Sequence, residues 1–90
     1  MTLRIDKQAL GRRVVLQLVG NLRSEDLDGL KAQIKIAGRE VVLDVGAVVL
    51  IGLDGIRFLN ACESGGIAIT NASPYISEWM ALERSTGSNG

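Results

Sequence analysis

The sequence predicts a single α/β domain with a mainly parallel sheet of about four strands, an antiparallel N-terminal edge strand and three helices. Short apolar segments with the two-residue period of strands alternate along the chain with segments of helical period. Strands that alternate with helices favour parallel pairing through right-handed crossovers. The 90 residues are enough for one compact domain, and 47% of them are hydrophobic, which supplies a core.

The first two segments are expected to form a β-hairpin at the edge of the sheet. Residues 3–9 alternate weakly between apolar and charged side chains, which is typical of an edge strand. Residues 13–19 alternate more strongly and predict a second strand, which the glycine and asparagine at 20–21 are expected to end. The glycine-arginine pair at 11–12 supplies a short turn, which favours antiparallel pairing.

The middle of the chain predicts a helix followed by the central strand of the sheet. Four apolar residues have helical spacing and form one stripe: Leu27, Leu30, Ile34 and Ala37. Ser24 is expected to cap the N-terminus of this helix, and Gly38 to end it. Residues 41–45 form a nearly continuous apolar run that ends at Gly46, as in a strand covered on both faces. We expect Asp44 to hydrogen-bond to the turn that follows it.

The second half of the chain predicts two more helices around a last strand. The second helix runs over about 54–64, and residues 67–70 form a further buried strand. The serine-proline pair at 73–74 opens the third helix, with serine as the cap and proline at the first helical position. Its apolar side contains Ile76, Trp79, Met80 and Leu82. Residues 85–90 are small and polar and are expected to form a flexible tail after a domain of residues 1–84.

Composition argues against several classes of function. Ten basic and ten acidic residues cancel, so we expect neither nucleic acid nor an anionic membrane surface as a partner. The chain has no histidine and a single cysteine, Cys62, which is expected to be a buried thiol on the second helix. These counts exclude a Ser-His-Asp triad and a zinc site within the chain, so we expect no catalysis and no cofactor. With no signal-peptide pattern and no segment suited to membrane insertion, the expected location is the cytoplasm.

Four segments carry a resemblance to a known family. Residues 15–22 are a strand that ends in Gly-Asn-Leu, and residues 40–46 are a strand that ends in Asp-Val-Gly. Residues 49–59 join a glycine-containing loop to a helix, and residues 65–74 join a strand to the serine-proline pair. In this order and spacing they resemble the STAS domain family (sulfate transporter and anti-sigma factor antagonist) over residues 3–83. The resemblance implies a STAS-like α/β fold.

The loop at 52–55 departs from the family pattern. In anti-sigma factor antagonists this loop usually reads Asp-Ser-Ser/Thr-Gly, and a partner kinase phosphorylates the hydroxyl residue before the glycine. Alignment on Gly55 places the aspartate position on Gly52, the first serine position on Leu53 and the phosphoacceptor position on Asp54. Because no hydroxyl remains in the loop, the resemblance implies a domain without the usual phosphorylation switch.

Two interpretations of Asp54 stay open at this point. Asp54 mimics the phosphorylated state, because it carries a negative charge at a helix start where a phosphate would carry nearly two. Alternatively, Asp54 is a helix N-cap in a domain that has lost the switch, because aspartate is among the best caps. Both interpretations predict a loop that cannot be phosphorylated at this position.

The resemblance implies a bacterial regulatory module that binds another protein. Its partner would be an anti-sigma factor, a kinase-like protein or another STAS protein. The expected contact residues are Gly52, Leu53, Asp54, Gly55, Arg57 and Asn60. An alternative is an accessory subunit that binds the ATPase of an ABC-type lipid transporter, which needs no phosphorylation switch. A homodimer, and binding of a nucleotide or lipid, are further options that the residues leave open.

Overall fold

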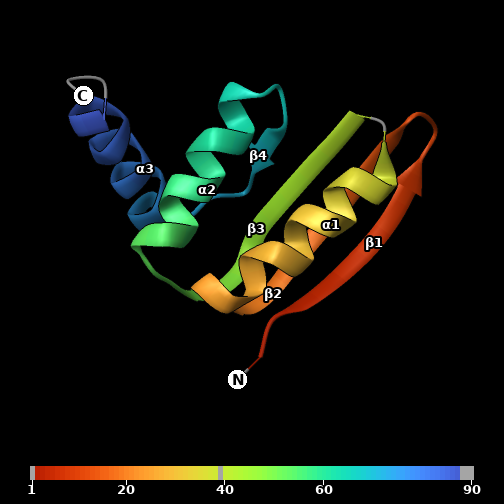
Figure 1. Cartoon of the computed structure of the whole chain (residues 1–90), viewed down its shortest axis with the longest axis horizontal. Helices are drawn as coiled ribbons and strands as arrows, with labels where there is room; N and C mark the ends of the chain where they lie inside the picture. The colour runs from red at the N-terminus through yellow and green to blue at the C-terminus, as the bar shows by residue number, and fades with distance from the viewer. Residues whose placement is uncertain (1, 39, 88–90) are drawn as a thin grey trace.

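A computed structural model of the chain describes residues 2–38 and 40–87. Its elements are β1 (Arg4–Leu10), β2 (Arg13–Leu22), a short 3₁₀ helix (Ser24–Asp26), α1 (Leu27–Ala37), β3 (Glu40–Ile51), α2 (Leu53–Ser64), β4 (Ala68–Thr70) and α3 (Pro74–Gly87). Within these two described ranges, four strands form one mixed sheet and three α-helices accompany it, so the fold is of the α/β class (Figure 1). The predicted order of strands and helices is confirmed.

The strands lie in the sheet in the same order as in the sequence, β1-β2-β3-β4. β1 pairs antiparallel with β2, so the predicted N-terminal hairpin at the sheet edge is confirmed. β2 pairs parallel with β3, and β3 pairs parallel with β4. The carboxyl ends of the three parallel strands therefore meet at one end of the sheet, where ligands and partners of open α/β sheets commonly bind.

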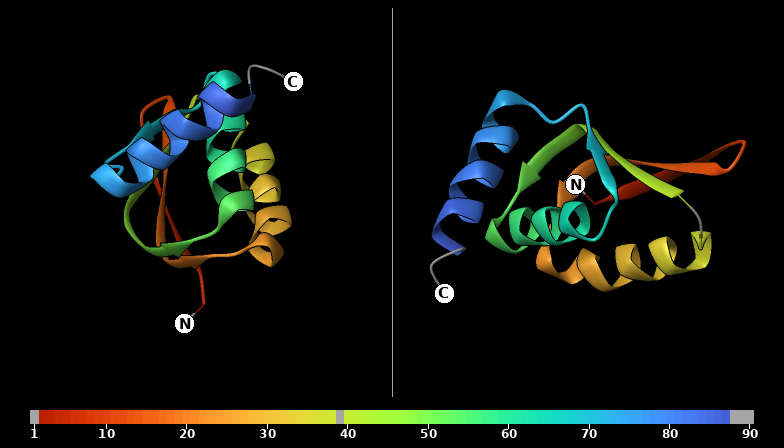
Figure 2. Two further views of the ribbon diagram at one scale, coloured as in Figure 1. Left: turned by 90° about the vertical axis from the view of Figure 1, so that its left-hand side faces the viewer. Right: turned by 90° about the horizontal axis from the view of Figure 1, so that it is seen from above.

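Both crossover helices cover the same face of the sheet. Figure 2 shows α1 and α2 side by side on one face, while α3 stands at one end of the sheet and packs against α2. Because the strand order advances in one direction, two right-handed crossovers place their helices on the same side. The core between the sheet and these helices contains fully buried leucines from both layers: Leu16 and Leu43 from the sheet, and Leu30 and Leu59 from the helices.

The prediction that the central strand is covered on both faces is wrong. Val15 on β2 and Val42 on β3 are only half-buried, and Gln17 is exposed. These side chains alternate with the buried ones, so they point to the face that α1 and α2 leave open. The sheet is thus mostly one-sided, and its core lies between the sheet and the two crossover helices.

β3 is longer than predicted because it continues past Gly46. The strand has twelve residues, and its register against β2 shifts twice, first between Gln17 and Val19 and again between Gly20 and Asn21. Each shift is a β-bulge that inserts one extra residue in β3. The prediction that β2 ends at the glycine and asparagine is also wrong, since that strand continues to Leu22.

The two bulges change which residues of β3 face the core. Val45, Val48 and Ile51 pack on the core at a spacing of three residues, although a regular strand would use a spacing of two. Asp44 stabilises the first bulge, because its Oδ1 atom accepts a hydrogen bond of 2.9 Å from the N–H of Gly46. The predicted hydrogen bond of Asp44 is confirmed, but its partner Gly46 lies within β3 and not in the expected turn.

The third helix begins at the predicted residue and ends later in the chain than predicted. Ser73 caps it, since the N–H of Ile76 donates to the Ser73 hydroxyl at 3.2 Å, and Pro74 is its first residue. The helix continues to Gly87, so the first half of the predicted tail is helical, and residues 88–90 lie outside the described residues. Leu82 is 66% exposed and does not belong to the packed side of this helix.

Candidate functional site

The candidate site is the junction where β3 ends and α2 begins. Gly52 is the N-cap of α2 in an extended conformation, Leu53 is the first helical residue and Asp54 the second. Gly52 has no side chain, so the N-cap position makes no side-chain capping hydrogen bond. The interpretation of Asp54 as the N-cap is therefore wrong, although its carboxylate lies in the first turn, where the helix dipole favours negative charge.

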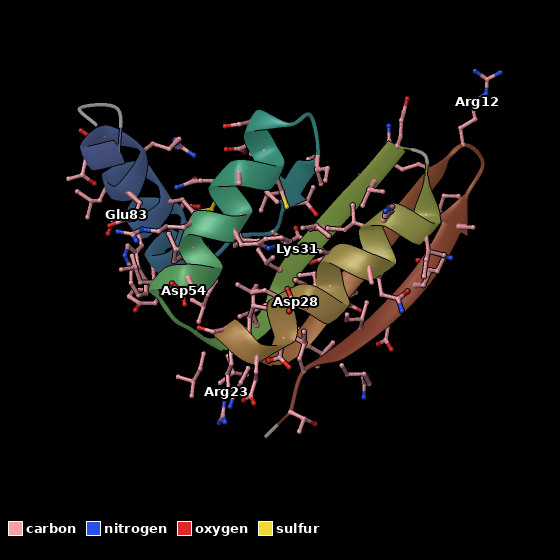
Figure 3. All side chains as sticks on the ribbon, in the orientation of Figure 1. Arg12, Arg23, Asp28, Lys31, Asp54 and Glu83 are labelled. Atoms are coloured by element: carbon pink, nitrogen blue, oxygen red, sulfur yellow. The ribbon has the colours of Figure 1, made fainter. Side chains whose placement is uncertain are left out.

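Asp54 instead contacts the segment that precedes α1. The hydroxyl of Ser24 donates a hydrogen bond of 2.6 Å to Oδ2 of Asp54 (Figure 3 labels Asp54). Ser24 therefore does not cap α1 as predicted; it begins the 3₁₀ helix, and Asp26 stands at the N-cap of α1. The contact joins the starts of the two helices that cover the sheet.

Gly55 allows α2 to approach β3 closely. A Cβ atom on Gly55 would lie 2.7 Å from Cγ1 and 3.1 Å from Cδ1 of Ile51, and 3.5 Å from Cδ2 of Leu22. The first of these distances is shorter than van der Waals contact, so a side chain here requires α2 or Ile51 to move. Gly55 is buried and contributes to packing, not to an exposed surface.

Arg57 and Asn60 lie one turn or more beyond the helix start and face α3. The Nε atom of Arg57 lies 3.2 Å from Oε1 of Glu83. Asn60 donates a hydrogen bond of 3.0 Å to the carbonyl of Met80 and accepts one of 3.1 Å from Arg84. Arg57, Asn60, Glu83 and Arg84 line a hollow of about 560 Å³ between the two helices. The structure thus pairs Arg57 with α3, although Arg57 lies only three residues after Asp54 on α2, and uses Asn60 in helix packing.

The junction carries an exposed apolar surface, of which the sequence predicted only one residue. Val49 is 67% exposed, Leu50 is 61% exposed and Leu53 is 39% exposed. We call these three residues the junction cluster. Only Leu53 was among the predicted contact residues; Val49 and Leu50 belong to the apolar segment 47–51 that precedes the loop. The second bulge, opposite Gly20 and Asn21, lies beside Val49 and shifts the strand so that Val49 and Leu50 point away from the core.

The described residues offer little for metal binding or nucleophilic catalysis. Within residues 2–38 and 40–87 there is no group of three or more aspartate, glutamate or cysteine side chains placed to hold a metal ion. The Cys62 thiol is buried on the inner face of α2, as predicted. Burial raises the pKa of Cys62, and the positive charge of Lys31 opposes that shift in part.

No family model and no curated protein matches the chain in comparisons with known proteins. The resemblance to the STAS family therefore remains a prediction. No helix of the described ranges combines the length and the apolar character that a bilayer crossing requires.

Proposed function

We propose that this protein is a regulatory binding module of the STAS type, and that its protein partner docks on the β3–α2 junction. The observation that carries the proposal is the junction cluster, three exposed apolar side chains beside the start of α2. Contiguous exposed apolar side chains on a small domain mark protein interaction sites more often than isolated ones do. Gly52, Leu53 and Asp54 are the predicted contact residues that lie at this surface.

The proposed module is not switched by phosphorylation at the usual loop position. Residues 52–55 contain no hydroxyl, and the position before Gly55 carries the carboxylate of Asp54. That carboxylate is already hydrogen-bonded to Ser24, so a fixed negative charge is held at the start of α2. The partner therefore meets an aspartate side chain at this position, unlike the partner of a domain whose loop is phosphorylated and dephosphorylated.

The proposed partner is an anti-sigma factor, a kinase-like regulator or another STAS protein in the cytoplasm of a bacterium. A transporter ATPase is a second candidate, and the loop without a hydroxyl favours it, because such an accessory subunit needs no switch. We propose no catalytic role for the chain.

Affinity capture from a lysate of the source cell tests the proposal. Wild type, Leu53→Ser and Leu82→Ser are compared as baits, with captured proteins identified by mass spectrometry. Leu82 is the matched control, since it is exposed but lies on α3 outside the junction cluster. We expect wild type and Leu82→Ser to capture the same regulatory protein and Leu53→Ser to lose it.

Two results of the capture would change the account. If all three baits capture the same proteins, the junction is not the docking surface. If the protein lost with Leu53→Ser is a transporter ATPase, the second candidate replaces the first. A fourth bait, Asp54→Asn, tests the phosphomimic interpretation, because it keeps an oxygen acceptor for Ser24 and removes the charge; unchanged capture would rule that interpretation out.

A further inference from the structure

We infer that the partner segment that docks on the junction cluster combines apolar side chains with lysine or arginine residues. This inference rests on the proposed function and names the chemistry of the partner at the same surface. It follows from the charges that border the cluster, which are mostly negative although the whole chain is neutral.

Four carboxylates lie in the first turns of the helices that start at this end of the molecule: Glu25, Asp26, Asp28 and Asp54. The 2.6 Å hydrogen bond between Ser24 and Asp54 brings the two helix starts together. In Figure 3, Arg23 lies at the lower edge of the molecule, with Asp54 above it on α2 and Asp28 above it on α1, next to Lys31. The backbone pairing between Leu22 and Ile51 also places the segment after β2 next to the junction cluster.

The neighbouring cations are few and are engaged in contacts of their own. Arg23 follows β2 directly and forms an ion pair of 3.8 Å with Glu25. One turn further from the junction, Arg57 is paired with Glu83 at 3.2 Å, and the Lys31 ammonium lies 5.9 Å from the centre of the Phe58 ring. Counted with these neighbours, five carboxylates (Glu83 included) stand against three cations, Arg23, Lys31 and Arg57, which leaves two negative charges at this border.

Helix dipoles alone explain acidic residues in first turns, because a carboxylate there stabilises its helix by about 0.3–1 kcal/mol. The junction cluster is a separate observation that the dipole does not explain. Val49 and Leu50 belong to β3, and their exposure of 67% and 61% leaves apolar area in water next to these carboxylates. An apolar patch with a charged rim is the composition of a protein interface.

Charge complementarity decides among the occupants of this surface. An acidic or phosphorylated segment, or an anionic membrane, would bring like charges together, and so would the same junction of a second copy. A segment with apolar side chains flanked by lysine or arginine covers the junction cluster and pairs with the carboxylates at its rim. The structure therefore favours a basic, apolar protein segment.

Two short amphipathic peptides test the inference by fluorescence anisotropy. They share the same leucines at helical spacing, and one carries lysine wherever the other carries glutamate. We expect wild type to bind the lysine peptide at least about tenfold more tightly than the glutamate peptide, with a difference that shrinks as salt is added. Leu50→Ser and Glu25→Lys should each weaken binding of the lysine peptide. The controls Leu82→Ser and Glu78→Lys, exposed on α3, should not.

Equal binding of the two peptides, tighter binding of the glutamate peptide, or no binding of either would overturn the inference. The outcome is independent of the capture experiment. If a partner is captured through Leu53 but the lysine peptide is not preferred, the charge inference fails and the proposed function stands. If the lysine peptide is preferred but no bait captures a partner through Leu53, the proposed function fails on its own.

Discussion

Asp54 is positioned by a residue that lies 30 positions earlier in the chain. The Ser24 hydroxyl donates to its carboxylate across the gap between the starts of α1 and α2. A hydrogen bond from a hydroxyl to a charged oxygen is shorter and stronger than one between neutral groups, which agrees with the 2.6 Å separation. The side chain that the STAS resemblance aligns with a phosphoacceptor is thus part of a contact between the segments where two helices begin.

A double-mutant cycle with Ser24→Ala and Asp54→Ala should show this contact in the stability of the protein. We expect a coupling free energy of about 1 kcal/mol, measured by urea denaturation, because each single substitution removes the same hydrogen bond. The control cycle pairs Asp54→Ala with Ser73→Ala, whose hydroxyl caps α3, and should be additive. Additive free energies in the first cycle would show that Ser24 and Asp54 do not interact.

Gly55 and Gly29 should respond to alanine in opposite directions. Gly55→Ala places a Cβ 2.7 Å from Cγ1 of Ile51 and should destabilise the protein by about 1–3 kcal/mol through overpacking. Gly29 lies in the first turn of α1 with no atom within 4 Å of the added Cβ, so Gly29→Ala should stabilise by about 0.5 kcal/mol. Thermal or urea denaturation of both variants gives the comparison, and equal effects would show that α2 does not pack on Ile51 as described.

Among the elements, α2 has two regions with different contacts. Its first turn, with Leu53 and Asp54, faces the proposed partner, while Asn60 faces α3. The Asn60 amide donates to the Met80 carbonyl and accepts from Arg84, which also pairs with Glu63 at 2.9 Å. Polar contacts between α2 and α3 thus hold the last helix at the end of the sheet.

Asn60→Ala should cost more stability than Arg57→Ala. The first substitution removes hydrogen bonds of a half-buried amide and should cost about 1–2 kcal/mol. The second removes an ion pair between Arg57, which is well exposed, and Glu83, and should cost at most about 1 kcal/mol. Urea denaturation measures both. If Arg57→Ala proves the more costly, the helix contact depends on the ion pair and not on the amide.

At the scale of the whole molecule, much of the fold follows from local pattern. The order of elements, the edge hairpin, the Ser73 cap and the Asp44 hydrogen bond were all predictable, because each depends on residues close together in the chain. The bulges of β3 were not, because they depend on register against β2, and periodicity within one strand does not determine the register.

The candidate site was predictable in position but not in composition. The glycine-containing loop marked the start of α2, and Leu53 and Asp54 do lie there on the surface. The contact of Asp54 with Ser24 and the use of Asn60 against α3 depend on helix packing between distant segments, which a single sequence does not encode locally. Val49 and Leu50 escaped notice because an apolar run reads as buried, and only the bulge turns these side chains outward.

The buried thiol should make the stability of the whole domain depend on alkaline pH. Burial raises the pKa of Cys62 in the folded state, so the folded thiol keeps its proton at pH values where the unfolded thiol has lost it. The contribution of Cys62 to the free energy of unfolding should therefore stay constant below about pH 8.5, and the free energy should decrease as the pH rises above that value. Cys62→Ala should lack this decrease. Parallel stability curves of wild type and Cys62→Ala from pH 7 to 10 would contradict the expectation.

The most direct test of the account is a calorimetric titration of the purified captured partner into wild type, Leu53→Ser and Leu82→Ser. The two substitutions remove one exposed leucine each, one inside the junction cluster and one on α3. The account predicts that Leu53→Ser weakens binding at least about tenfold, because it removes apolar area from the interface, and that Leu82→Ser binds like wild type. Equal affinity of wild type and Leu53→Ser, or a loss confined to Leu82→Ser, would contradict docking at the β3–α2 junction.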